Sequence, residues 1–416
     1  MNRVPLRRNR DFVLLQFGQG LSTLGSTSTY VAYPLLVLGL THSPAKAGAV
    51  GFANVLPYAL FALLAGVVAD RVDRKRLMIA MDLVRAAAMA SIVAALAAGV
   101  LIFWQVAAVA FVEGSAFVFF NIAEVGALRS VVPAPQLPDA AAAEQSRYAA
   151  VTIAGPSVGG ALFGVGRSLP FLVDAVSYAA SILTLTWMRT PFQETRERDP
   201  APLRAQVREG VAWLWANAYL RTSALIFAGG NFVFSGIYLV FVVFAKRDGL
   251  SPAAIGALVA AFGGASLAGA LVAPRMAKLL SMRSIMLGNE WLSAALILCA
   301  IAPGPYVLLA CVLPIAFFSQ SLNSVVIGYR TAITPDHLVG RVSSVARNLA
   351  QIAAPLGPLV AGLLLASLSP RATMLVLGGI ALALAVWTTA SPSIRNAPSL
   401  SELENPPDAR PATMEA

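Results

Sequence analysis

Charged side chains inside long apolar stretches are the residues of this sequence that point to chemistry. A charge in such surroundings is costly and, in membrane-spanning proteins, usually serves a function. An acidic group there can take up and release a proton, so three isolated acids are candidates for proton coupling: Glu113, Asp174 and Glu290. Asp82 and Arg85 are three residues apart and share one helix face, where we expect a structural ion pair.

Glu113 is the strongest of the three candidates. It lies near the middle of an apolar stretch, in AFVEGSAF, with no Lys or Arg nearby on the same helix face. Without a cationic partner, its carboxyl group would be suited to carry a proton. A hydrogen-bonded glutamic acid with no role in transport is the alternative interpretation.

A second group of charges fills the segment DRVDRKR, residues 70–76, although only 12% of the chain is charged. We expect Asp70 to end one apolar helix and the basic residues after it to begin the next. The carboxylate could pair with an Arg or with a helix N-terminus in one state and lose that partner in another. We interpret the loop as a latch supported by Asp82 and Arg85; alternatively, its positive charge only holds the loop in the cytoplasm.

The composition indicates a membrane protein of many spans. The 416 residues are 58% hydrophobic and have a mean hydropathy of +0.73, whereas soluble proteins carry about 25% charged residues. The formal charge of +10 does not indicate a nucleic-acid partner, because the basic residues fall in short turns between apolar stretches. Cys299 and Cys311 lie inside apolar stretches and are expected to be buried and unpaired. No residue pattern indicates a metal or a cofactor.

The apolar stretches predict an all-α membrane protein. A helix needs about 20 apolar residues to cross a bilayer, and strands are not expected because the runs are continuous and rich in Ala and Leu. Lys and Arg gather on alternate loops, which places both termini in the cytoplasm. Twelve stretches are long enough, at about 12–38, 46–69, 77–99, 101–124, 146–166, 169–188, 222–245, 252–274, 284–303, 305–328, 344–367 and 371–390.

A polar segment divides these stretches into two sets of six. We expect a six-helix bundle at 1–188, a cytoplasmic linker at 189–221, a second six-helix bundle at 222–390 and a disordered tail at 391–416. The linker contains an amphipathic stretch, LRAQVREGVAWLWANAYLR, that suits a helix lying at the membrane interface.

Short motifs recur in the two halves in the same order. SPAKAGA at Ser43 matches SPAAIGA at Ser251, and GPSVGG at Gly155 matches GPLVAG at Gly357. Repeats of this kind are typical of transporters built from two pseudo-symmetric halves, with the substrate site between them near the midplane.

These motifs resemble those of the major facilitator superfamily, over about residues 10–390. The segment GVVADRVDRKR is similar to the superfamily's loop signature between spans two and three, although Asp73 stands where a second Gly is usual. The chain looks closest to the branch of drug, siderophore and macrolide exporters, because GPSVGG is similar to the span-five signature of drug antiporters. The matching positions are Gly66, Asp70, Arg71, Arg74, Lys75 and Arg76 in the loop and Gly155, Pro156, Gly159 and Gly160 in span five.

The resemblance implies secondary active transport by alternating access. We expect a monomer, in the cytoplasmic membrane of a bacterium, that exports a small hydrophobic or amphipathic organic compound by proton antiport. Spans 1, 4, 7 and 10 usually line the cavity in this superfamily, and the spans with Asp174 and Glu290 are usually peripheral. In the span-four signature an Arg precedes the Gly, whereas this chain has Ala110. Cavity residues are then expected at Gln19, Tyr30, Phe117, Asn121, Asn231, Phe234, Tyr238, Gln320 and Asn323.

Other functions stay open at this point. An importer, or a transporter of lipids or lysolipids, would share the same sequence features. A membrane enzyme would need polar residues clustered at one membrane face, and the only two histidines, His42 and His337, are expected on opposite sides of the membrane. A sensor that does not transport would need an added domain.

Overall fold

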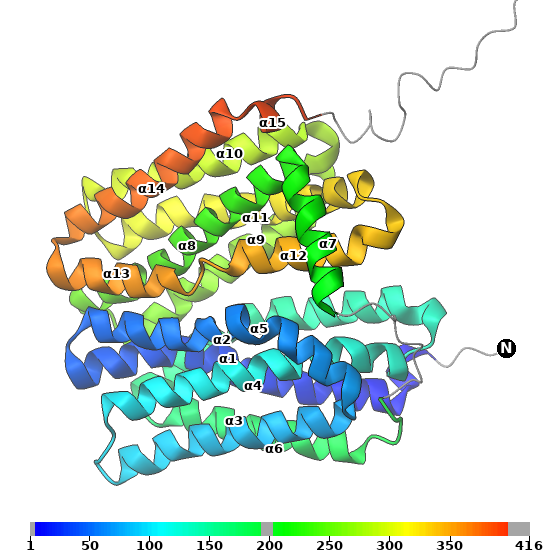
Figure 1. The fold of residues 1–416 in the computed structure, drawn as a ribbon. Helices are drawn as coiled ribbons and strands as arrows, with labels where there is room; N and C mark the ends of the chain where they lie inside the picture. Colours follow the sequence, from blue (N-terminus) through cyan, green and yellow to red (C-terminus); the bar gives the residue numbers. More distant parts are fainter. Residues whose placement is uncertain (1–4, 193–202, 398–416) are drawn as a thin grey trace, which may run out of the picture.

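The computed structural model describes residues 5–192 and 203–397, and within these ranges the chain forms helices and no strands (Figure 1). The first half contains six long helices: α1 (Arg10–Thr41), α2 (Pro44–Arg71), α3 (Arg74–Ala97), α4 (Phe103–Val131), α5 (Leu137–Val165) and α6 (Leu169–Trp187). The second half contains α7 (Leu203–Ala216), α8 (Ala218–Arg247), α9 (Pro252–Leu279), α10 (Met282–Ala294), the 3₁₀ helix η3 (Ala295–Ala300), α11 (Pro305–Ile333), α12 (Asp336–Gln351), α13 (Leu356–Ser367), α14 (Pro370–Ala390) and α15 (Pro392–Arg395).

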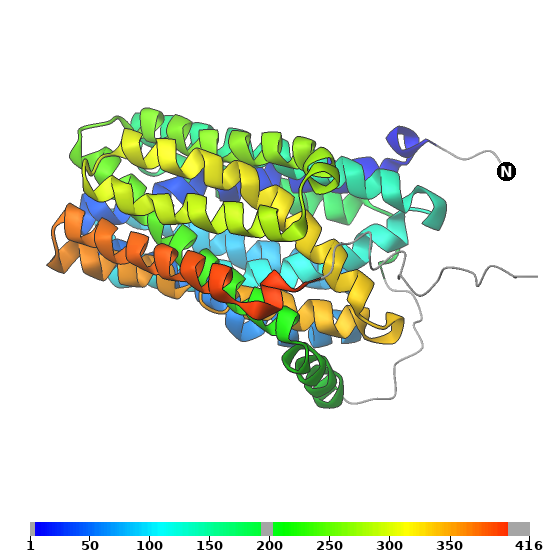
Figure 2. The same cartoon turned by 90° about the horizontal axis from the view of Figure 1, so that it is seen from above.

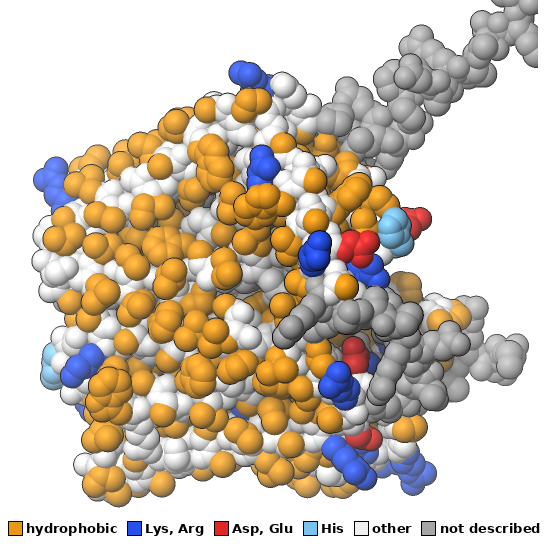
Figure 3. Space-filling model, viewed as in Figure 1, with side chains coloured by type: hydrophobic (Ala, Val, Ile, Leu, Met, Phe, Trp, Pro, Cys, Tyr) orange, Lys and Arg blue, Asp and Glu red, His pale blue; other side chains and the backbone are white. Residues whose placement is uncertain are grey.

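The predicted all-α membrane fold is confirmed. Ten helices of the described ranges are long and apolar enough to cross a membrane. The two other predicted spans fall on α1, where QFGQGLSTLGSTSTY dilutes the apolar residues, and on α10 followed by η3. Hydrophobic side chains cover most of the face in Figure 3, and the described charged residues gather toward its two ends, as a bilayer requires.

Serine–proline pairs begin several of the spans. Ser43, Ser251 and Ser369 each accept a hydrogen bond from the backbone N–H three residues later, at 3.2 to 3.3 Å. The proline that follows each serine occupies the first helical position, where its missing N–H costs nothing. The repeated SPA motif therefore sets the start of α2 and α9 at equivalent places in the two halves.

The predicted span at 344–367 is interrupted, and the structure divides it into α12 and α13 around a turn at 352–355. Pro355 and Pro358 supply no backbone N–H, so carbonyl groups one turn earlier lose their helical donors. Side chains of α8 fill part of this gap: Asn231 donates to the Ala350 carbonyl at 2.9 Å, and Ser235 donates to the Ala354 carbonyl at 2.7 Å. Irregular backbone inside a membrane needs such internal partners.

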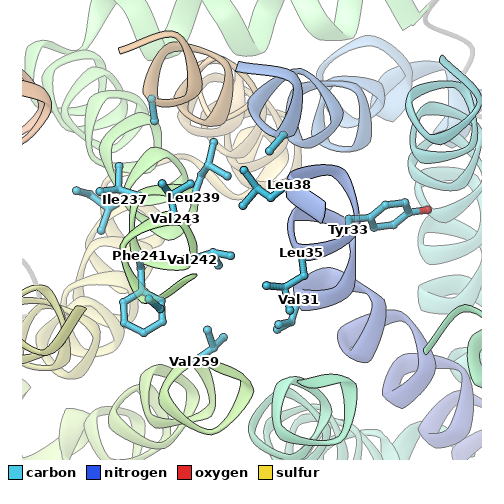
Figure 4. Packing of buried hydrophobic residues seen from close by; sticks show 14 of the residues in the cluster. Val31, Tyr33, Leu35, Leu38, Ile237, Leu239, Phe241, Val242, Val243 and Val259 are labelled. Carbon is cyan, nitrogen blue, oxygen red and sulfur yellow. The ribbon is translucent and has the colours of Figure 1, made fainter. Parts of the chain in front are cut away.

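The two halves form two layers, α1–α6 and α8–α14, which lie one above the other in Figure 1 and overlap in the view from above in Figure 2. Near the turn between α1 and α2, a single cluster of buried hydrophobic residues spans both halves. Val31, Leu35 and Leu38 of α1 face Leu239 and Val242 of α8 across it (Figure 4).

At the other end each half has a hydrophobic cluster of its own. One contains Phe12 and Met78 of the first half, and the other contains Tyr219, Met282 and Tyr329 of the second half. Within the described residues, a hydrophobic cluster common to both halves lies at the end where α1 leads into α2, whereas the end where α7 lies has only separate clusters. We call these the closed end and the open end.

Glycines bring the halves together on both sides of the shared cluster. On one side α5 meets α9, and a methyl group added to Gly160 would lie 2.2 Å from the Pro252 carbonyl oxygen. On the other side α2 meets α13, and a methyl group on Gly48 would lie 2.3 Å from the Pro358 carbonyl oxygen. The SPA repeat of each half therefore packs against the GP repeat of the other.

Replacing Gly160 by Leu is expected to separate the halves at the closed end, because the side chain would overlap the backbone of α9. In a background with Cys299 and Cys311 replaced by Ala, a cysteine at Val31 should then react with a membrane-impermeant maleimide about tenfold faster, equivalent to about 1.4 kcal/mol in the opening equilibrium. Gly164→Leu is the matched control, because no atom lies within 4 Å of a methyl group built there. Equal labelling of the two variants would contradict the packing argument.

Candidate functional site

Arg85 of α3 is the centre of a buried polar network in the first half. Its guanidinium pairs with Asp82 at 3.5 Å and with Glu113 of α4 at 3.2 Å, and it donates to the Ser26 hydroxyl of α1 at 2.9 Å. The guanidinium carbon also lies 4.1 Å from the ring centroid of Tyr178 of α6, where a cation–π contact adds to the pairing. One cation thereby joins four helices.

Glu113 is buried and has partners that its own helix does not reveal. Besides Arg85, its carboxylate accepts a hydrogen bond from Asn54 of α2 at 2.7 Å. Gly114 makes this approach possible, because a methyl group there would lie 2.0 Å from the Asn54 carbonyl oxygen. No Lys or Arg lies near Glu113 on its own helix face, but the structure supplies a cation from α3, Arg85. Glu113 lies about one helical turn from Ala110, the position where the superfamily signature has its own arginine.

Asp174 belongs to the same network, although its span was expected to be peripheral. It is fully buried, and it accepts hydrogen bonds from Thr29 and Tyr178, each at 3.2 Å, and from Ser177 at 3.4 Å. The Tyr178 hydroxyl also lies 3.5 Å from Glu113, so one side chain connects the two acids. Within the described residues Asp174 makes no ion pair. We call the set Asp82, Arg85, Glu113, Asp174 and Tyr178 the acid network.

The charged loop at 70–76 lies at the open end of the first half. Asp70 is 69% exposed in its side chain and pairs with Arg74 at 3.2 Å, within its own loop. Asp73 accepts the backbone N–H of Arg76 at 2.9 Å and caps α3, so the acid that replaces the usual glycine starts the next helix. Lys75 donates to the Met188 carbonyl at the end of α6, at 2.6 Å.

The other loop residues lie at the surface or pack loosely. Arg71 and Arg76 are exposed, and a methyl group on Gly66 would meet no atom within 4 Å. The predicted supporting role of Asp82 and Arg85 toward this loop differs from the contacts observed, because their partners lie deeper, in the acid network.

A cavity of about 580 Å³ lies within the second half, between α8, α10, α11, α12 and α14. The cavity extends from Leu220 and Arg347, near the open end, to Ile237 and Val312, which belong to the shared hydrophobic cluster. Four predicted cavity residues line it, and nine polar or charged lining residues were not predicted as cavity residues. The predicted ones are Asn231, Phe234, Gln320 and Asn323, and the others are Ser223, Ser266, Asn289, Glu290, Ser293, Ser319, Arg330, Arg347 and Gln351.

The remaining predicted cavity residues lie elsewhere. Tyr30 and Tyr238 stack between the halves with ring centroids 4.5 Å apart, and the Tyr238 hydroxyl donates to the Tyr30 carbonyl at 3.3 Å. Gln19 is buried and donates to Ser181 of α6 at 3.3 Å. Phe117 lies beside the Arg85 guanidinium, 5.6 Å from ring centroid to carbon, and Asn121 is half-buried on α4.

The fold and these features define a membrane transporter of the major facilitator type. Two solved structures share the fold. A bacterial homologue of the human lysosomal transporter Spinster, inward-facing, matches with a TM-score of 0.71 at 14% identity, over 95% of this chain and 98% of that one. A bacterial homologue of the iron transporter ferroportin, also inward-facing, matches with a TM-score of 0.68 at 14% identity, over 94% of this chain and 100% of that one.

A family model for transmembrane secretion effectors matches residues 3–408, and the chain belongs to this family. The multidrug efflux pump Tap of Mycolicibacterium fortuitum is 29% identical over 399 residues, which cover 92% of this chain and 96% of that protein. Macrolide efflux protein A of Streptococcus pyogenes is 28% identical over 236 residues, which cover 55% of this chain and 57% of that protein.

Removing the cation of the acid network should destabilise the protein strongly. Arg85→Met leaves Asp82 and Glu113 buried without their counter-ion, and breaking a buried pair in this way costs about 3–5 kcal/mol. Thermal unfolding of the purified protein in detergent should show a large fall in Tm, whereas Asp70→Asn, which breaks an exposed pair worth about 0–1 kcal/mol, should change Tm little.

A double variant separates this charge effect from a simple loss of packing. Glu113→Gln combined with Arg85→Met should recover part of the lost Tm, because one of the unpaired carboxylates is then absent. A double variant that is less stable than Arg85→Met alone would show that side-chain packing, and not charge balance, holds the network together.

Proposed function

We propose that the protein is a proton-coupled exporter of small hydrophobic or amphipathic organic compounds, working as a monomer by alternating access. The observation that carries this proposal is the difference between the two ends: a shared hydrophobic cluster closes one, while the other holds separate clusters and a cavity. Such a chain can take up a compound from one side and release it on the other after the halves rock. The named functions of the multidrug and macrolide efflux relatives support export as the direction.

The proposed orientation follows from the charges of the loops. The open end carries the 70–76 loop with its four cations, and such loops lie in the cytoplasm. The cavity then opens to the cytoplasm, both termini lie on that side, and the membrane is the cytoplasmic membrane of a bacterium. The aromatic and amide lining supplied by Phe234, Asn231 and Gln320 suits an amphipathic compound.

We assign the proton to the acid network, with Glu113 and Asp174 as its carriers. The acid network contains three carboxyl groups and one guanidinium, and only Asp82 and Glu113 pair with that guanidinium. The network therefore has the capacity to hold a proton inside the membrane. The Tyr178 hydroxyl lies within 3.5 Å of both carriers and offers a path between them. A change in the protonation of Glu113 would alter its pairing with Arg85, which holds α3 and α4 together.

Proton antiport can be tested in everted membrane vesicles that are energised to be acidic inside and report pH with a dye. A panel of macrolides, catechol siderophores and lipophilic dyes is added to wild-type vesicles, and proton release is expected with at least one compound. Glu113→Gln should abolish this release, because an amide can neither hold nor release the proton. Gln105→Glu vesicles, changed on the same helix outside the network, serve as the control and should behave as wild type.

The outcomes of this experiment separate the parts of the proposal. Release that survives Glu113→Gln but is lost in Asp174→Asn would leave Asp174 as the carrier. Release that survives both substitutions would remove the acid network from the proton path. No release with any compound, in vesicles where the protein is present, would contradict proton-coupled export of these classes.

The charged loop yields a second test. We propose that Asp70 exchanges its pairing with Arg74 for a contact with the second half when the open end closes. Asp70→Asn should therefore leave the amount of protein in the membrane unchanged and slow transport about tenfold, which corresponds to about 1.4 kcal/mol in one step of the cycle. Asp73→Asn keeps a helix cap and is the matched control. Equal transport rates of wild type and Asp70→Asn would contradict the latch.

A further inference from the structure

Glu290 of α10 is a carboxyl group in the wall of the cavity, outside the acid network. Its side chain belongs to a residue that is only 4% exposed, and it lines the cavity together with Phe234 of α8 and Ser319 of α11. The span that carries it was expected to be peripheral. Instead, α10 packs against α11 and α14, which brings Glu290 to the inside of the second half.

The contacts of Glu290 hold its carboxyl group in place without neutralising it. The side-chain amide of Asn289 donates to the Oε1 atom of Glu290 at 3.2 Å, and the Oδ1 atom of the same amide accepts a hydrogen bond from the Ser319 hydroxyl at 3.1 Å. Within the described residues no Lys, Arg or His forms an ion pair with Glu290. A carboxylate in a low-dielectric site needs a counter-charge, and the Asn289 amide supplies only a neutral hydrogen bond. A bound cation would supply the counter-charge.

Two other charged groups line the cavity, and both lie nearer its mouth. Arg330 follows Ser319 by eleven residues on α11, which places it about 16 Å further along the helix axis. Arg347 lies on α12 at the same end. The other lining residues include amides and hydroxyls, such as Gln320 and Ser319, and apolar side chains, such as Ile237 and Leu296.

We propose that Glu290 binds the ammonium group of an amphipathic amine, with the apolar part of that compound packed against Phe234, Ile237 and Leu296. An ammonium that leaves water for this cavity needs a carboxylate partner, and the pair is fixed by charge-assisted hydrogen bonds. A carboxyl group holds either a proton or an ammonium, so any proton on Glu290 leaves for the solvent when the amine enters. This inference rests on the proposed export function and narrows its substrates to amines.

The test compares two compounds that differ in the charge of one nitrogen. One is a macrolide with a dimethylamino sugar, and the other is the same macrolide with one N-methyl group replaced by a formyl group, which makes that nitrogen a neutral amide. Binding to the full chain in lipid nanodiscs is measured by equilibrium dialysis. Wild type should bind the amine about tenfold tighter than the amide, as expected for about 1.4 kcal/mol of charge pairing. Glu290→Gln should bind both compounds with the affinity that wild type has for the neutral one.

Matched variants make the assignment specific. Asp336→Asn, which removes an exposed carboxyl group at the start of α12 and outside the cavity, should keep the preference for the amine. A preference that persists in Glu290→Gln, or equal binding of the two compounds by wild type, overturns the inference while the export function stands. If wild type binds neither compound, the proposed function fails for this class and the inference fails with it.

A substitution that disturbs folding is recognised by lost binding of the neutral compound. In that case Glu290→Asp is measured instead, because this variant keeps the carboxyl group on a side chain that is one methylene shorter. A preference for the amine in Glu290→Asp supports the inference, and equal binding of the two compounds by that variant overturns it.

Discussion

The cost of burying one guanidinium inside the membrane governs the first half of this transporter. Arg85 can remain charged there only while Asp82, Glu113, the Ser26 hydroxyl and the Tyr178 ring all surround it. These partners come from four different helices, so the demand for complete pairing fixes how those helices pack. In the alternating-access mechanism that we propose, this half would move as one body.

The second half is built differently, although its motifs repeat those of the first. Its buried acid, Glu290, faces a cavity instead of a cation, and the turn between α12 and α13 leaves backbone that Asn231 and Ser235 must satisfy. Proton and substrate are thus assigned, in our proposal, to different halves. Coupling between them would then pass through the α1–α8 contact, where Tyr30 and Tyr238 meet.

The helices could be predicted from the sequence, because long apolar stretches and Ser-Pro starts are local signals. The pairing of the repeats could not, since SPA and GP motifs mark equivalent positions but do not say that each packs against the opposite half. The Arg85–Glu113 pair was missed because the residues lie on different helices, 28 positions apart. Glu290 was expected on a peripheral span because of the resemblance, and only the packing of α10 against α11 and α14 brings its side chain to the cavity. Pro355 and Pro358 lie inside the predicted span at 344–367, and they are the local signal for the break between α12 and α13.

On both sides of the shared hydrophobic cluster, the two halves meet through close backbone contacts. At both α2–α13 and α5–α9, a glycine lies against the carbonyl oxygen of a proline from the other half. Backbone surfaces carry no rotamers to freeze, and weak Cα–H to oxygen contacts are each worth about 0.5–1 kcal/mol. Because these contacts are weak and involve no ordered side chains, separating the halves at the two seams would cost little free energy. In our proposal, the equilibrium between the two conformations, each closed at one end, is then set by three terms. These are the shared hydrophobic cluster, a compound bound in the cavity and a proton bound in the acid network.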